Sequence, residues 1–257
     1  MNKSKKNAAF TLIELVVVLM VLVALAGILL PQFSGMVSRT HTAAASTNFA
    51  EINKAVNFYA VKTLQGYPDK LDIPLHSNGG AAPTALADTL QSQTDMSVVT
   101  LAANQIQSLT NAGITTVYPL FNMADLPTTV NQSATFGGTD LANPVLYTGA
   151  TTAPAVQMSD ARAAHEFGSS LQGAVAGEMY VIFGLNDSST AIPTAMMQAP
   201  VHFDQVDPAK VYSRFFLVFA IPSNTTAQFN ARFVGSVGAE LSGWSGHISD
   251  YYGKNSQ

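Results

Sequence analysis

The chain has 257 residues, of which 47% are hydrophobic, enough apolar material for a sizeable core and too much for a disordered protein. Only 11% of the residues are charged. Cysteine is absent, so disulfides, thiolate catalysis and cysteine-ligated zinc are excluded. Between Gly66 and Ala161 the sole lysine or arginine is Lys70, against seven aspartates. Nucleic acid binding needs clustered cations, so we expect no nucleic acid contact from this domain.

The first long apolar segment runs from Phe10 to Leu30 and contains Thr11 and Glu14 as its conspicuously polar residues. As a helix, 21 residues would be roughly 30 Å long, about the thickness of the bilayer core. Three lysines precede it, at positions 3, 5 and 6. By the positive-inside rule, the N-terminus is cytoplasmic and the chain beyond the segment lies across the membrane.

An ordinary secretory signal peptide is one alternative, because Ala24-Leu25-Ala26 before Gly27 fits a small-residue cleavage site. An uncleaved anchor is another. Glu14 argues against the signal peptide, because a carboxylate near the start of an apolar span is expensive, at about 2.5–3.5 kcal/mol on insertion scales near the centre of a span, and such groups usually have a partner.

Residues 5–15 read Lys-Lys-Asn-Ala-Ala-Phe-Thr-Leu-Ile-Glu-Leu. This run resembles the prepilin leader and cleavage site of type IV pilins and type II secretion pseudopilins. The resemblance implies cleavage by prepilin peptidase between Ala9 and Phe10, N-methylation of Phe10 and retention of the apolar helix. The family normally has Gly before the cut, where this chain has Ala9.

Two further residues acquire roles from this resemblance. The family's glutamate at the position of Glu14 pairs with the N-terminal amine of a neighbouring subunit, and in a low dielectric a paired charge is tolerated where an unpaired one is penalised. Pro31 matches a proline common at the end of the family's membrane segment, where loss of a backbone donor lets the helix bend or locally melt. We therefore expect Glu14 to act in assembly and Pro31 to kink the helix.

An amphipathic pattern continues the helix after Pro31. Large apolar residues recur at three- and four-residue steps, at Phe33, Val37, Phe49, Ile52, Val56, Tyr59 and Leu64. Gly66 and Pro68 then supply a stop signal. The pattern predicts one long interrupted helix from about 10 to 64.

The chain after the helix is expected to form an α+β fold of pilin type, with an antiparallel β-sheet head packed on the apolar stripe of the helix. We predict helices over 97–111 and after Ser159-Asp160, and strands over 114–118, 178–185, 213–221 and 229–237, the last two as a hairpin. The predicted divisions are a leader (1–9), a transmembrane and assembly helix (10–31), its amphipathic continuation (32–65), a loop-rich elaboration (66–160) and a β-rich head (161–257).

The sequence offers little that indicates chemistry. His165-Glu166 lacks the second histidine of a zinc-protease helix and is interpreted as a surface position. The segment 243–247 lacks the final glycine of a nucleophile elbow. The aspartate pairs 69/72 and 204/207 lack calcium-loop spacing and favour solvated turns. We therefore predict no metal site, no cofactor and no enzymatic activity.

Three aromatic residues close to the end of the chain, Trp244, Tyr251 and Tyr252, fit either subunit contacts or sheet packing.

These features predict a structural subunit of a type IV pilus-like filament or a type II secretion pseudopilus. Its expected partners are prepilin peptidase, other pilin or pseudopilin subunits, an inner-membrane assembly platform and membrane lipid. Its expected location is the inner membrane as a single-pass protein, with the C-terminal domain periplasmic or extracellular in the filament. The alternative is a membrane-anchored or secreted binding or enzymatic domain whose first segment mimics a prepilin.

Overall fold

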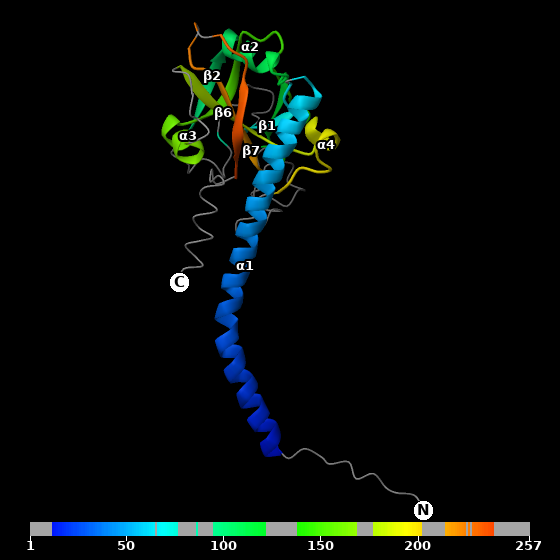
Figure 1. Cartoon of the computed structure of the whole chain (residues 1–257), viewed down its shortest axis with the longest axis vertical. Helices are drawn as coiled ribbons and strands as arrows, with labels where there is room; N and C mark the ends of the chain where they lie inside the picture. Colours follow the sequence, from blue (N-terminus) through cyan, green and yellow to red (C-terminus); the bar gives the residue numbers. More distant parts are fainter. Residues whose placement is uncertain are drawn as a thin grey trace, which may run out of the picture.

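The computed structural model describes residues 12–64, 66–76, 86, 95–121, 138–168, 177–201, 214–224, 226 and 228–238, with the backbone alone over 28–42. A long helix, α1 (Leu12–Lys62), leads into a head built on one sheet (Figure 1). The strands are β1 (Leu71–His76), β2 (Met96–Ala102), β3 (Thr116–Leu120), β4 (Val145–Leu146), β5 (Thr152–Met158), β6 (Glu178–Gly184), β7 (Phe216–Pro222) and β8 (Arg232–Val237). The shorter helices are α2 (Ala103–Asn111), α3 (Asp160–Phe167) and α4 (Ala191–Thr194).

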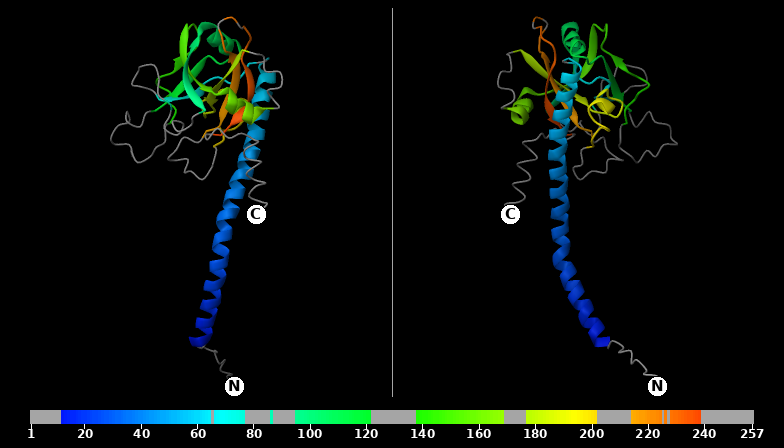
Figure 2. Two further views of the ribbon diagram at one scale, coloured as in Figure 1. Left: turned by 90° about the vertical axis from the view of Figure 1, so that its left-hand side faces the viewer. Right: turned by 45° about the vertical axis from the view of Figure 1, so that its right-hand side comes forward.

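The helix α1 is continuous over its 51 residues and includes Pro31, so the interruption expected near that residue is wrong. Proline removes one backbone hydrogen bond, and the helix continues on both sides of that position. Figure 2 shows a gradual curve along the lower part of α1 rather than a break. That Pro31 sets this curve stays a prediction.

The upper part of α1 packs against the sheet through the predicted apolar stripe. Ala45, Phe49, Ile52 and Val56 are all buried, and their spacing of three and four residues places them on one helix face. The Phe49 ring meets the Phe215 ring edge-on, with 4.9 Å between ring centroids. The stripe ends before Leu64, which is 91% exposed.

The sheet is mixed, so the prediction of a purely antiparallel sheet is wrong. Its central strand, β6, pairs antiparallel with β7 along its whole length on one edge. The other edge of β6 pairs with β5 near its start and with β1 at its end. The strand β1 then pairs with β3 in parallel, because the intervening chain, which includes β2 and α2, is long enough for a crossover connection.

Several predicted elements are confirmed with shifted ends. The strand β6 lies where expected, and β7 and β8 form the predicted antiparallel hairpin. The helix α3 begins after Ser159, whose side-chain oxygen accepts a hydrogen bond from the Arg162 N–H and so caps the first turn. The strand predicted over 114–118 is β3, two residues further along the chain.

The helix predicted to begin at Ser97 is wrong in its first half. Residues 96–102 instead form β2, which pairs with β5 over seven consecutive positions, and α2 begins only at Ala103. The β-branched run Val98-Val99-Thr100 favours an extended backbone, and the available partner strand decides the outcome. The three- and four-residue spacing of apolar residues in this short stretch does not reveal that a distant strand is available to pair with it.

The strands β1 to β5 come from the range 66–160, and β6 to β8 come from the range 161–257. All eight belong to one sheet. The two ranges thus contribute to a common hydrophobic core, to which Leu71 and Phe219 both belong.

Replacing Phe49 by Ala should lower the free energy of unfolding by about 3–5 kcal/mol, because it removes a fully buried aromatic side chain and leaves a cavity. The matched control is Phe58→Ala on the same helix, where the ring is 55% exposed and the loss should be below about 1 kcal/mol. Urea unfolding of the full chain in detergent measures both. Equal losses in the two variants would contradict the assignment of the buried stripe.

Candidate functional site

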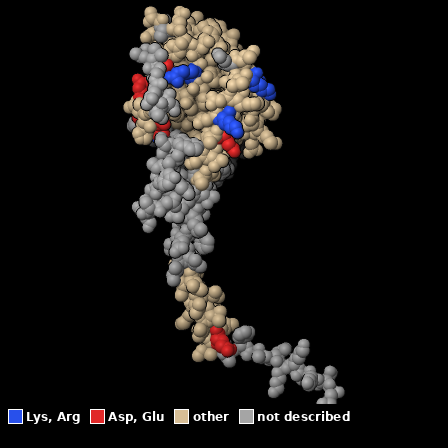
Figure 3. Space-filling view, viewed as in Figure 1, with Lys and Arg blue, Asp and Glu red and all other residues tan. Residues whose placement is uncertain are grey.

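The lower part of α1 exposes apolar side chains on every side. All sixteen residues from Leu12 to Gly27 are exposed, including Leu12 at 82% and Met20 at 70%. Their single charged member is Glu14, and Figure 3 shows an acidic side chain near this end of the helix. A helix that is apolar all round is expected inside another apolar phase, such as lipid or packed protein.

Within the part of the chain that the structure describes, no helix is long and apolar enough to cross a membrane.

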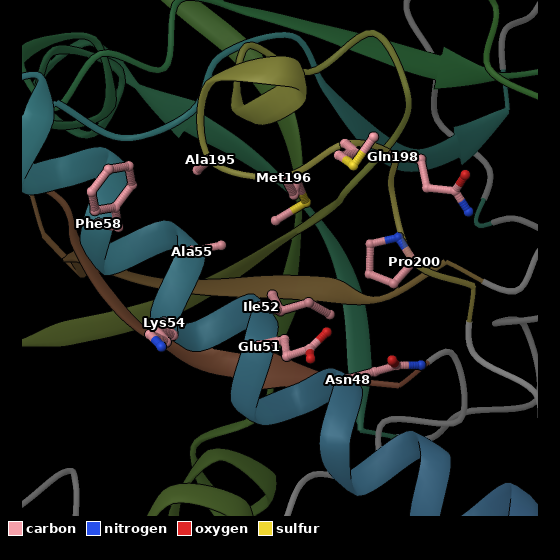
Figure 4. Close-up of a pocket in the computed structure, with 11 residues that line it drawn as sticks. Asn48, Glu51, Ile52, Lys54, Ala55, Phe58, Ala195, Met196, Gln198 and Pro200 are labelled. Atoms are coloured by element: carbon pink, nitrogen blue, oxygen red, sulfur yellow. The ribbon is translucent and has the colours of Figure 1, made fainter.

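A groove lies higher on α1, between the helix and the segment that follows α4 (Figure 4). It has a volume of about 440 Å³. Ile52, Ala55 and Phe58 line one wall, and the opposite wall is formed by Ala195, Met196, Met197, Gln198 and Pro200. Met197 is 95% exposed. Asn48, Glu51 and Lys54 also line the helix wall, so the groove combines an apolar, methionine-containing surface suited to packing contacts with polar and charged side chains.

The sequence reasoning missed this groove. Phe58 lies outside the buried stripe of α1. A helical wheel of the sequence could therefore have indicated an apolar side chain outside that stripe. The two methionines after α4 carry no such signal, because their exposure depends on the path of the chain between α4 and Val201.

The far wall of the groove is tied to the rest of the head by polar contacts. The Tyr59 hydroxyl donates to Thr190 Oγ1 at 2.9 Å, and the Asp69 N–H donates to the same oxygen at 2.8 Å. The Asp69 carboxylate accepts hydrogen bonds from the N–H groups of Thr115 and Thr116, each at 2.8 Å, and from the Thr115 hydroxyl at 2.6 Å. Asp69 therefore joins β3 to Thr190 at the start of α4, and Thr190 in turn contacts α1 through Tyr59.

The interpretation of Asp69 and Asp72 as a solvated turn is wrong for Asp72, whereas Asp69 lies in the connection before β1 and is half-buried. Asp72 lies within β1, is fully buried and accepts a hydrogen bond from Asn186 Nδ2 at 2.6 Å. The Asp72 carboxylate thus has the protein donor that a polar group in a core usually requires, and the half-buried Asp69 carboxylate also accepts hydrogen bonds from protein groups.

Asp187 connects the end of the groove wall, at Ala199, to Arg214 through hydrogen bonds. Burial acts to raise the pKa of its carboxyl, but hydrogen bonds from Arg214, at 2.8 Å, and from the Ala199 N–H, at 3.0 Å, outweigh this and hold the pKa below its usual range. Asp187 therefore stabilises the folded state fully above its unfolded-state pKa, near 4. This stabilisation is lost as the pH falls through the lower pKa that the carboxyl has in the folded state.

The Asp187→Asn variant should therefore lose less stability than the wild type between pH 5 and pH 3. The difference should be below about 1 kcal/mol, because the Asp187 side chain is 60% exposed and solvent screens the pair with Arg214. Thermal unfolding of both proteins at a series of pH values measures it. Identical pH profiles would show that this carboxylate does not hold the loop.

The dipeptide His165-Glu166 divides between surface and interior. His165 is exposed as predicted, whereas the Glu166 side chain is 1% exposed and pairs with Arg162 one turn earlier at 3.0 Å. The surface interpretation is therefore wrong for Glu166, because the arginine allows its carboxylate to be buried. Among the described residues, no three His, Asp or Glu side chains gather closely enough to hold a metal ion.

Several predicted residues lie outside the described part of the chain: Ala9, Phe10, Asp204, Asp207, the segment 243–247 with Trp244, and the tyrosines 251 and 252.

The family model that matches this chain describes the prokaryotic N-terminal methylation motif, and it covers residues 4–30. The chain carries the prepilin-type signature of type IV pilins and pseudopilins. The match includes Ala9, Phe10 and Glu14 and the exposed apolar part of α1. No curated protein and no solved structure matches the chain significantly.

The prepilin-type motif implies processing by prepilin peptidase and assembly with other pilin subunits. The exposed stretch from Leu12 to Gly27 is the part of this prepilin segment that the structure describes in full. The head beyond it has an α+β fold with a mixed sheet.

Proposed function

We propose that this protein is a structural subunit of a type IV pilus-like filament or a type II secretion pseudopilus, and that its work is mechanical rather than catalytic. The observation that carries the proposal is the lower part of α1, which belongs to the methylation motif and exposes apolar side chains all round. In a filament, packing between the helices of many copies would remove this surface from water. At about 25 cal/mol per Å² of apolar surface, such burial is a large driving force.

Before assembly, the segment from Phe10 to Leu30 is proposed to hold the subunit in the inner membrane as a single span. Its 21 residues match the thickness of the bilayer core, and the lysines at 3, 5 and 6 favour a cytoplasmic N-terminus. The head would then lie in the periplasm, from which the assembly platform raises the subunit into the filament. Lipid and neighbouring helices are alternative apolar surroundings for the same side chains.

Glu14 is proposed to set the register of assembly. It is the one charged residue among the sixteen exposed residues at this end of α1. In apolar surroundings, a carboxylate is strongly stabilised by a nearby cation, so a positive N-terminal amine on a neighbouring copy would fix the axial position of the incoming helix. The absence of a cysteine pair mildly favours a pseudopilin or a minor pilin over a major pilin.

Cleavage between Ala9 and Phe10 is the first test of this proposal. The mature protein purified from cells that contain the prepilin peptidase should begin with N-methylated Phe10, as read by N-terminal sequencing and intact mass. The Ala9→Gly variant should be processed at least as fast, because it restores the family's usual residue, and Ala8→Gly serves as the matched control. A mature chain that begins at Gly27, or an intact Met1, would contradict the proposal.

The second test concerns assembly. Replacing Glu14 by Ala should leave a protein that still inserts into the membrane but forms filaments at least about tenfold less abundantly, measured by shearing and immunoblotting. Glu51→Ala is the control, since Glu51 is an exposed carboxylate on the same helix but lies outside the methylation motif. Normal filament yield from the Glu14 variant would refute the pairing role.

A further inference from the structure

A second, chemically different pocket lies on the head between α2 and residues 228–230. Its volume is about 350 Å³, and α2 lies at the end of the molecule opposite the lower part of α1 (Figure 1). Its lining consists of five carboxamide side chains, one hydroxyl and one aromatic ring: Asn104, Gln107, Ser108, Asn111, Gln228, Phe229 and Asn230. No side chain in this lining is charged.

Three of the five carboxamides in this pocket form a chain of hydrogen bonds. Gln107 Nε2 donates to Asn111 Oδ1 at 2.6 Å, and Asn111 Nδ2 donates to Asn230 Oδ1 at 3.2 Å. The Ala231 N–H donates to the Ser108 carbonyl at 3.1 Å and holds the 228–230 segment against α2. The two hydrogen bonds between carboxamides do not use the side-chain oxygen of Gln107, which can accept, or the side-chain NH₂ group of Asn230, which can donate. The pocket surface therefore presents hydrogen-bond donors and acceptors side by side.

Ser108 supplies an independent indication of a ligand. The residue is 3% exposed, and no described group hydrogen-bonds to its hydroxyl. A buried hydroxyl without a partner costs about 1–3 kcal/mol, and native structures seldom retain one without a reason. Ser108 belongs to the pocket lining, but its hydroxyl oxygen has almost no accessible surface, so a bound hydroxyl group would pair with it only after a small movement of a neighbouring lining side chain.

We propose that this pocket binds a neutral carbohydrate. Neighbouring sugar hydroxyls are both donors and acceptors, which matches carboxamide side chains that present both kinds of group. The half-buried ring of Phe229 offers an apolar surface for the C–H face of a sugar ring. Phosphorylated or acidic ligands are disfavoured, because recognition of such groups relies on Arg or Lys and this lining has neither.

Carbohydrate binding at this pocket does not depend on filament assembly. The pocket is built from α2 and the chain before β8, whereas the proposed assembly surface lies on the lower part of α1. Loss of either activity should leave the other in place.

The test uses the full chain solubilised in a zwitterionic detergent without a sugar headgroup, applied to an array of neutral, sialylated and phosphorylated oligosaccharides and uncharged peptides. The wild type should bind a subset of the neutral oligosaccharides. Titration of the best of these should show at least about tenfold weaker binding by Asn111→Ala and by Asn230→Ala, each of which removes hydrogen bonds. Asn57→Ala, an exposed carboxamide on α1, is the matched control and should bind normally.

Ser108→Ala separates binding from folding. It removes a hydroxyl that has no partner in the described structure, so the melting temperature should stay the same or rise while carbohydrate binding falls. The proposal is overturned if the wild type binds no neutral oligosaccharide, if it selects peptides or phosphorylated sugars instead, or if the Asn111, Asn230 and Ser108 variants bind as tightly as the wild type.

Discussion

The helix α1 is divided between two kinds of apolar surface, and the rest of the structure depends on this division. Between Ala45 and Val56, four apolar side chains form a single stripe that is buried against the head. From Leu12 to Leu25 the large apolar side chains point in every direction and are exposed in the isolated chain. One part of the helix is covered by the fold of the chain, and the other exposes apolar side chains all round, as expected of a helix that lies within another apolar phase.

Much of this division could be predicted from the sequence. The run from Phe10 to Leu30, the three lysines before it and the stripe through Phe49 and Val56 are local patterns with direct physical meaning. The hairpin of β7 and β8 and the helix after Ser159 are equally local. Each of these features depends on residues close together in the chain.

Features that depend on distant parts of the chain could not be predicted in the same way. The strand β2 exists because residues 152–158 pair with it, and the parallel contact of β1 with β3 depends on the path of the intervening chain. Asp69 and Asp72 resembled a solvated turn because their partners, Thr115, Thr116 and Asn186, lie far away in sequence. The carboxamide pocket likewise joins α2 to residues more than a hundred positions later.

The central claim is that the lower part of α1 packs against the same part of other copies. A photoreactive amino acid in place of Val18, which is 57% exposed, tests it directly in cells that assemble the protein. Illumination should yield a species of twice the subunit mass in which mass spectrometry finds Val18 joined to residues 10–31 of a second copy, while the same group at exposed Thr100 on the head should not give this adduct. Adducts to lipid alone at position 18, with no protein partner, would contradict the account.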